Sequence, residues 1–223
     1  MGESSMVWVW IGVAFFVGLP AVVAGLQLIA FTTAKVERVE GRDRDALHQA
    51  AEREIGRGFF EGKAFRFVGA YRLKTFMGRP AAVMWQHGGE GTYLAALLVA
   101  GAKQIHTDIV SILSWERGIG VTTATAKDGH VVPKPPGAWM QSFSGVTTAV
   151  LWERHQEAEA AVADHYGVTP EPFTLDPGEV LLRSVRRDAV YNLTHPWLLG
   201  VIVWRFWIGK HLLHGKRVAE RLG

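Results

Sequence analysis

Apolar residues follow one another without a charged position from Val7 to Phe31, a run of 25 residues near the start of the chain. At about 1.5 Å per residue, a helix of this length extends roughly 37 Å, which is enough to cross a hydrocarbon core about 30 Å thick. A cleaved signal peptide would need a basic segment before a shorter apolar run, and residues 1–6 contain no Lys or Arg. The pattern therefore predicts a retained transmembrane helix over residues 7–33.

The charges beside this helix predict its orientation. Basic residues follow the apolar run at Lys35, Arg38, Arg42 and Arg44. Because basic flanks remain in the cytoplasm, we expect residues 1–6 outside and the rest of the chain on the cytoplasmic side of a bacterial inner or intracytoplasmic membrane. Trp8 and Trp10 are then expected in the outer aromatic belt.

A second apolar stretch, Pro196–Gly209, lies near the other end of the chain. Its 14 residues are too few for a span, and Arg205 in mid-bilayer would cost about 2.5–3.5 kcal/mol. We expect residues 197–221, within a C-terminal unit of residues 194–223, to form an amphipathic basic helix on the cytoplasmic membrane surface. A buried core helix and a second span are the alternatives. The residues expected at the interface are Trp197, Trp204, Trp207, Arg205, Lys210, Lys216 and Arg217.

Shorter hydrophobic periods occupy the middle of the chain. Residues 34–62 predict a basic juxtamembrane helix around "DRDALHQAAEREIGRG", and residues 63–193 predict a cytoplasmic domain. The turn sequences between the strand-like runs are short, which favours antiparallel neighbours over helical crossovers. The predicted strands cover residues 64–73, 81–86, 92–100, 103–113 and 118–126.

Two helices are expected after these strands. The first covers residues 147–167, where apolar positions recur at helical spacing and Gly167 ends the run. The second begins at Asp176, because Pro177 and Glu179 complete an N-terminal capping pattern. The fold class is therefore α+β, with an antiparallel sheet, flanking helices and a single N-terminal transmembrane helix.

Charge is segregated along the chain, which has 24 Lys and Arg against 21 Asp and Glu. The segments beside both predicted membrane elements are net basic, whereas residues 80–179 are net acidic. Anionic lipid attracts juxtamembrane cations, so a membrane surface is an expected partner. No nucleic-acid-binding motif accompanies the basic pI, and we expect no nucleic-acid partner. The absence of Cys excludes disulfides, thiol catalysis and Cys-ligated metals.

Motifs that would indicate an enzyme are incomplete. The loop "QHGGEGT" at residues 86–92 lacks the Lys of a P-loop. His155 and Glu159 are one helical turn apart without the H-E-x-x-H arrangement, which favours a solvated helix face over a metal site. His106 and Asp108 share a strand face and are the best candidates for an acid–base pair. We expect no catalytic activity, no metal and no cofactor.

Small residues line one face of the N-terminal helix. Ala14, Gly18, Ala21 and Gly25 are spaced by four, three and four positions. In lipid, such a face allows another helix to approach closely, so these residues predict packing against other transmembrane polypeptides of a larger complex. The alternative is coincidence, because membrane helices are rich in Gly and Ala in any case.

Part of the chain resembles a known group of sequences. The segments "TYLAALLVAGAKQIHTDIVSIL", "GVTTATAKDGH" and "LWERHQEAEAAV" resemble an uncharacterised group of bacterial proteins over about a third of the chain. This resemblance implies no activity and no catalytic residue. In layout, the predicted outside N-terminus, single span and cytoplasmic β-rich domain are similar to the H subunit of purple-bacterial photosynthetic reaction centres.

Taken as a sequence, the chain favours a non-catalytic accessory subunit that stabilises a bacterial membrane complex. The layout implies a photosynthetic or other bioenergetic host. One alternative is a membrane-anchored enzyme or ligand-binding domain that uses residues 86–92 with His106 and Asp108. Another is a module that senses anionic lipid through the C-terminal helix.

Overall fold

A computed structural model describes residues 6, 8, 10, 14–88, 91–98, 105–169 and 175–222. It contains a seven-stranded sheet in which the strands follow their sequence order. All neighbouring strands are antiparallel except the last two, which are parallel. The strands are β1 (Lys35–Val39), β2 (Phe65–Lys74), β3 (Ala81–His87), β4 (Thr92–Leu98), β5 (His106–Ser114), β6 (Ile119–Ala124) and β7 (Ala138–Ser142).

The predicted α+β class and the largely antiparallel sheet are confirmed. The chain reverses direction after each of β2 to β5, and consecutive strands pair antiparallel, as the short separators indicated. The segment 34–62 differs from its prediction, because it begins with β1 before the helices α3 (Gly41–Ile55) and α4 (Arg57–Gly62). Strand β7 was not predicted either. It follows the 3₁₀-helix η2 (Lys127–His130) and a proline-containing loop.

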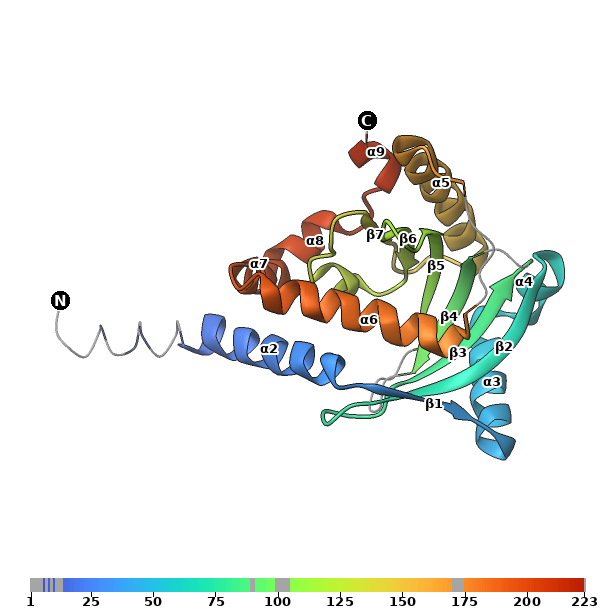
Figure 1. Ribbon diagram of the computed structural model, residues 1–223, viewed down its shortest axis with the longest axis horizontal. Coiled ribbons are helices and arrows are strands. Elements are labelled where there is room, and N and C mark those ends of the chain that lie inside the picture. The colour runs from blue at the N-terminus through green and yellow to red at the C-terminus, as the bar shows by residue number, and fades with distance from the viewer. Residues whose placement is uncertain are drawn as a thin grey trace.

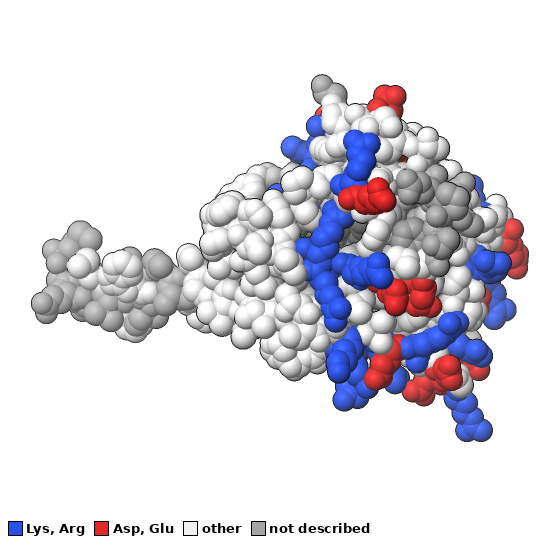
Figure 2. Space-filling view, in the orientation of Figure 1, with Lys and Arg blue, Asp and Glu red and all other residues white. Residues whose placement is uncertain are grey.

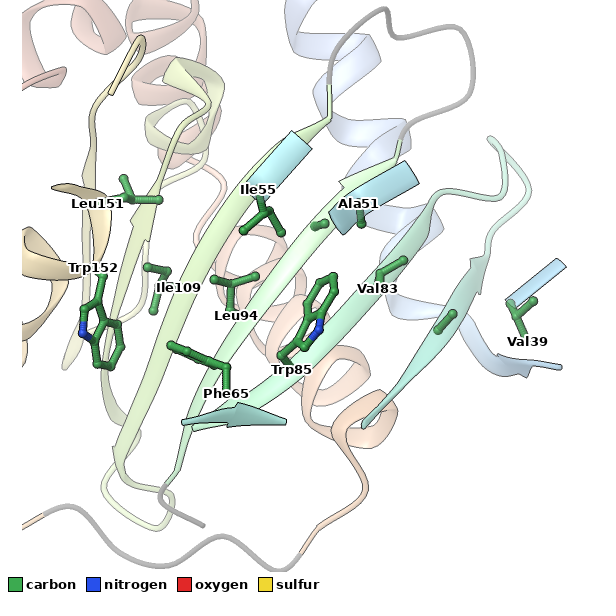
Figure 3. Close-up of a cluster of buried hydrophobic side chains, with 12 residues drawn as sticks. Val39, Ala51, Ile55, Phe65, Val83, Trp85, Leu94, Ile109, Leu151 and Trp152 are labelled. Carbon is green, nitrogen blue, oxygen red and sulfur yellow. The ribbon is translucent and has the colours of Figure 1, made fainter. Parts of the chain in front are cut away.

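Helices cover both faces of the sheet (Figure 1). On one face, α3 and α5 (Thr148–Tyr166) pack on a core that includes Trp85, Leu94 and Ile109 (Figure 3). On the other face, α6 (Pro177–Thr194) contributes Val180 to a second cluster of buried residues. Every second residue of a strand points to the same face, so the strands supply apolar side chains to both layers.

The caps of α5 and α6 agree with the sequence. The hydroxyl of Thr147 accepts a hydrogen bond from the amide of Val150, and Gly167 ends α5 in the left-handed conformation. Asp176 caps α6 by accepting from the amide of Gly178, with Pro177 in the first turn. Helix α5 therefore ends at the predicted glycine, and α6 begins at the predicted capping residue.

The N-terminal apolar segment forms one helix in the described residues, with a π-helical start, η1 (Ala14–Gly18), leading into α2 (Leu19–Thr32). Among the described residues, Phe15–Thr32 is the one helical stretch long and apolar enough to cross a membrane by length and composition. Only 17% of it is buried against the rest of the chain. The predicted part before Ala14 lies outside the described residues, apart from three isolated positions.

The C-terminal segment is not the single helix predicted over residues 197–221. The helical run consists of α7 (Leu198–Trp204), the π-helical η3 (Arg205–Gly209) and α8 (Lys210–Leu213), and it stops there. His214 is extended and Gly215 has a φ of +79°, a conformation that a glycine adopts without strain. The chain then turns into α9 (Val218–Leu222), which packs on α5 through the buried Val218.

Candidate functional site

A group of helices whose one Lys or Arg is Arg205 and which contains no Asp or Glu projects from one end of the domain (Figure 2). We call it the apolar cap and define it as η1, α2, residues 189–197 of α6 and its following turn, α7 and η3. Its interior is a small cluster in which Leu28 of α2 meets Ala189 of α6 and Ile202 of α7. Its exposed large side chains are Phe15, Phe16, Val17, Leu19, Val22, Val23, Leu26, Ile29, Val190, Leu193, Trp197, Trp204, Phe206, Trp207 and Ile208.

The last charged residues before the apolar cap lie near the end of α2 and in the middle of α6. The guanidinium of Arg186 donates to the carbonyl of Ala34, which follows α2, at 2.5 Å. Two residues farther along α6, Asp188 forms an ion pair with Lys134 at 2.6 Å. Residues 189–204 then carry no charge, and neither does α2. Lys and Arg side chains gather in a band beside this uncharged surface in Figure 2.

In the helical run from α7 to α8, the charged side chains point in the direction opposite to that predicted for a membrane-surface helix. Its two charged residues face the protein: Arg205 donates to the carbonyl of His130 at 3.3 Å, and Lys210 pairs with Asp128 at 2.8 Å. Ile202 is buried, but Trp204, Phe206, Trp207, Ile208 and Leu212 are exposed. A helix on a membrane surface would direct the charges to water and the apolar side chains to lipid or protein. Here both charged side chains are bonded to residues of η2, and no described part of the chain covers the exposed apolar side chains.

Trp207 of η3 lies beside η1, at the end of the N-terminal helix that is farther from Lys35. Its indole nitrogen donates to the carbonyl of Phe16 at 2.7 Å, and the two rings are 5.5 Å apart. Phe16 precedes Thr32 by 16 residues, or about 24 Å of helix. The segment from α6 to η3 therefore lies along most of the described length of η1 and α2 (Figure 1).

The other predicted interface residues are dispersed. Trp8 and Trp10 are exposed, as are Trp197 and Trp204. Arg217 does not extend from the cap, because its guanidinium pairs with Glu157 of α5 at 3.0 Å. Lys216 precedes it in the turn that leads to α9 and is exposed.

Among the described residues, the small-residue face of η1 and α2 is outside the cluster that packs α2 on α6 and α7. The contact with α6 and α7 is made by Ala24, Leu28 and Phe31, and the small residues lie roughly 90° around the helix from it. A side-chain carbon added at Gly18 or Gly25 would meet nothing within 4 Å, and Ala21 between them is partly exposed. The surroundings of Ala14 lie outside the description. This face is open to a neighbour.

A buried polar network connects the sheet to α5. His155 is completely buried, with Nε2 at 2.8 Å from the hydroxyl of Ser111 and Nδ1 at 3.0 Å from that of Thr123. Ser111 also donates to Glu159 at 2.7 Å and meets Thr92 at the same distance. The expectation of a solvated face is therefore wrong for His155. Burial lowers its pKa to about 3, so the imidazole is neutral and structural.

The proposed acid–base pair is not assembled. His106 and Asp108 both lie on β5, but only Asp108 lines a cavity of about 220 Å³ between the sheet and α6. One carboxylate oxygen of Asp108 is buried and accepts no hydrogen bond from the described residues. Burial raises the pKa of Asp108 to about 6, and Lys134 opposes this increase. The loop at residues 86–92 includes positions outside the described residues, and the described part of the chain groups no three His, Asp or Glu residues suited to a metal ion.

We expect Asp108→Asn to stabilise the protein at pH 7 by about 1–2 kcal/mol, after allowance for solvent in the cavity. The raised pKa means that ionised Asp108 disfavours the folded state above pH 6, a cost that disappears as the pH falls below 4. Urea unfolding at pH 7 and pH 4 measures the difference. Asp188→Asn is the control, because it removes a carboxylate of the same cavity that is paired with Lys134 and should destabilise. A stability gain for Asp108→Asn that persists at pH 4 would contradict this account.

Comparison with models of known protein families gave no match, and neither the curated proteins nor the solved structures contain a match to this chain.

Proposed function

We propose that the protein is a non-catalytic accessory subunit that is anchored in a bacterial membrane and stabilises a larger membrane complex. The apolar cap carries this proposal. A surface of exposed Trp, Phe, Ile and Leu side chains this extensive is far larger than a soluble monomer tolerates, and it is bordered by basic residues. Such a surface is stable when lipid or protein covers it.

In the proposed arrangement α2 crosses the bilayer and the α6–α7 segment inserts beside it. The sheet domain then lies in the cytoplasm, with Lys35 and the following basic residues at the membrane surface and residues 1–6 outside. The inward-facing Arg205 supports insertion, since its charge is directed to the carbonyl of His130 rather than to lipid. This differs from a helix lying on the surface, because Trp207 is beside Phe16 of η1, within the apolar run that continues to Phe31.

The uncovered small-residue face supports a partner within the membrane. Gly18 and Gly25 expose helix backbone at positions that no described part of the chain occupies. Backbone exposed to lipid gains packing when another helix covers it. We propose that the partner is a transmembrane polypeptide of a photosynthetic or other bioenergetic complex, with which the layout agrees.

The test is whether changes on this face release the protein from its complex. In Gly18→Ile with Ala21→Ile, the side chain added at Gly18 meets nothing within 4 Å and Ala21 is partly exposed, so the fold should be retained while helix packing is blocked. Native membranes are extracted in gentle detergent and resolved by native electrophoresis and mass spectrometry. We expect the unmodified chain to migrate in stoichiometric amount with a large complex and the variant to migrate alone.

The matched control is Val23→Phe, which adds bulk on a different, exposed side of α2. It should leave the complex intact. A lone unmodified chain in the native gel would rule out the subunit proposal, and release by Val23→Phe as well would show that the small-residue face has no special role.

A second candidate function is small-ligand binding in the cavity between α6 and the sheet. It is favoured by the unpartnered carboxylate oxygen of Asp108, which faces a mainly apolar cavity that also includes Tyr93 and Val180. A ligand with an amine would compensate the carboxylate. Small amines should then raise the unfolding temperature of the unmodified protein and have no effect on Asp108→Asn.

A further inference from the structure

A second cavity, of about 280 Å³, lies where the C-terminal segments meet the start of β7. Its wall combines His130 of η2, Arg205 of η3, Arg221 of α9 and Tyr166 at the end of α5. These four residues come from segments far apart in the sequence. The chain turns at His214 and Gly215 into α9, from which Arg221 reaches the cavity and donates to the carbonyl of Met140 in β7.

Two guanidinium groups line this cavity without a carboxylate. Neither Arg205 nor Arg221 forms an ion pair with any Asp or Glu of the described residues. Each donates one hydrogen bond to a main-chain carbonyl, Arg205 to His130 at 3.3 Å and Arg221 to Met140 at 2.9 Å. Burial lowers the pKa of Arg221, which reflects the unfavourable position of a cation without a counterion.

Donors with no acceptor lie on the same cavity. The Nε of Arg205 and the Nε2 of His130 are both buried and have no hydrogen-bond partner among the described residues. His130 is 4% exposed, and its pKa is lowered to about 4, first by burial and then by Arg221 and Arg205, with smaller effects from His214 and Lys134. The imidazole is therefore neutral near pH 7, and the tautomer with a proton on Nε2 can donate.

We propose that this cavity binds a phosphate group. The oxygens of a phosphate can accept hydrogen bonds from the two guanidinium groups and from the imidazole N–H. The negative charge of the phosphate compensates Arg205 and Arg221. The remaining cation of the wall, Lys134, is already paired with Asp188, so the uncompensated charge belongs to the two arginines. The proposal does not require α2 to cross a bilayer. The phosphate belongs either to a phospholipid headgroup at the edge of the apolar cap or to a soluble phosphate compound.

Thermal unfolding of the purified full-length protein in neutral detergent tests the proposal. The probes are inorganic phosphate and phosphatidylglycerol, and their controls are sodium chloride at equal ionic strength and uncharged diacylglycerol. We expect one probe to raise the unfolding temperature of the unmodified chain above its control. Arg205→Gln and Arg221→Gln should each weaken the apparent affinity for that probe about tenfold or more, because each removes a charge-assisted hydrogen bond.

The proposal also predicts the unfolding temperatures of the two variants in the absence of either probe. Because the positive charges of Arg205 and Arg221 repel each other when no anion lies between them, removal of one guanidinium should leave the unfolding temperature nearly unchanged. Arg217→Gln is the matched control on the same segment, since Arg217 pairs with Glu157 outside the cavity and its loss should not alter probe affinity. If Arg221→Gln does not fold, Arg205→Gln decides the question.

Stabilisation by phosphatidylglycerol alone identifies a lipid headgroup, and stabilisation by inorganic phosphate identifies a soluble source. The proposal is overturned if neither probe stabilises the unmodified protein, or if both glutamine variants respond as the unmodified protein does. These outcomes are independent of the native-gel experiment on Gly18 and Ala21, so failure of the phosphate site and failure of the subunit proposal can be told apart.

Discussion

Acidification from pH 6.5 to pH 3 is expected to destabilise the folded protein by about 4–5 kcal/mol through His155 alone, at about 1.4 kcal/mol per pH unit. The side chain is completely buried, and its pKa is lowered from 6.5 to about 3 by burial. An unfolded chain takes up a proton on this imidazole near pH 6.5, whereas the folded chain does not. The stabilising contribution of neutral His155 is therefore complete above pH 6.5 and lost progressively as the pH falls. This loss is comparable with the total stability of many domains.

Urea unfolding followed by tryptophan fluorescence between pH 7 and pH 4 measures this dependence. Asp108 acts in the opposite direction between pH 6 and pH 4, so the series is best performed in the Asp108→Asn background. His130, with a pKa of about 4, adds to the loss caused by His155.

The control for the acid effect is His155→Gln, which keeps a hydrogen-bonding side chain between Ser111 and Thr123 but cannot titrate. It should be less stable than the unmodified protein at pH 7 and show a clearly smaller dependence on pH. An equally steep pH dependence in His155→Gln would mean that another group causes the acid sensitivity.

Replacement of Ala189 by Asp is the second change with a large expected effect. Ala189 is 1% exposed and lies between Leu28 of α2 and Ile202 of α7. A carboxylate at this position would be buried without a cation among the neighbouring residues of the cluster, which costs about 3–5 kcal/mol. We expect α2 to separate from α6 and α7. Faster proteolysis in detergent between α2 and β1, together with a lower urea midpoint, would report this separation.

Val190→Asp is the comparison variant, since it places the same charge at the adjacent position, where the side chain is 49% exposed. In detergent it should retain the fold and the resistance to proteolysis. If the proposed insertion is right, it should nevertheless reduce the fraction of the chain recovered with membranes, because the carboxylate would face lipid. Equal loss of proteolytic resistance in Ala189→Asp and Val190→Asp would contradict the packing of the apolar cap.

The sheet could be predicted because local sequence controls most of it. Short turn sequences such as "HGGEG" leave no room for a crossover, and β3 and β4 are nearly continuous apolar runs. The first and last strands could not be predicted in this way. β1 is five residues rich in charge, and β7 is five residues after a proline-containing loop, so both are strands because β2 and β6 pair with them.

The apolar cap and the buried polar network around His155 could not be predicted, for a different reason. Arg205 and Lys210 within an apolar run indicate a polar helix face when the run is taken alone, yet their acceptors are in η2, about 80 residues earlier in the chain. His155 has the spacing of a solvated helix position, but Ser111 and Thr123 on the sheet bury it. Hydrophobic periodicity describes the element to which a residue belongs. It contains no information on the polar partner that another element supplies.

The connection between α2 and β1 has a mechanical consequence. Only Thr33 and Ala34 separate the two elements, Ala34 is fully buried, and Arg186 holds its carbonyl. Because the link is short and fixed, the sheet has little freedom to rotate about the axis of α2. A force along that axis acts parallel to β1. It is opposed in shear by all five antiparallel residue pairs between β1 and β2 together. These pairs extend from Lys35 opposite Lys74 to Val39 opposite Ala70. If α2 is the membrane anchor proposed above, it would transmit a pull to the whole sheet, whereas a flexible linker would absorb it.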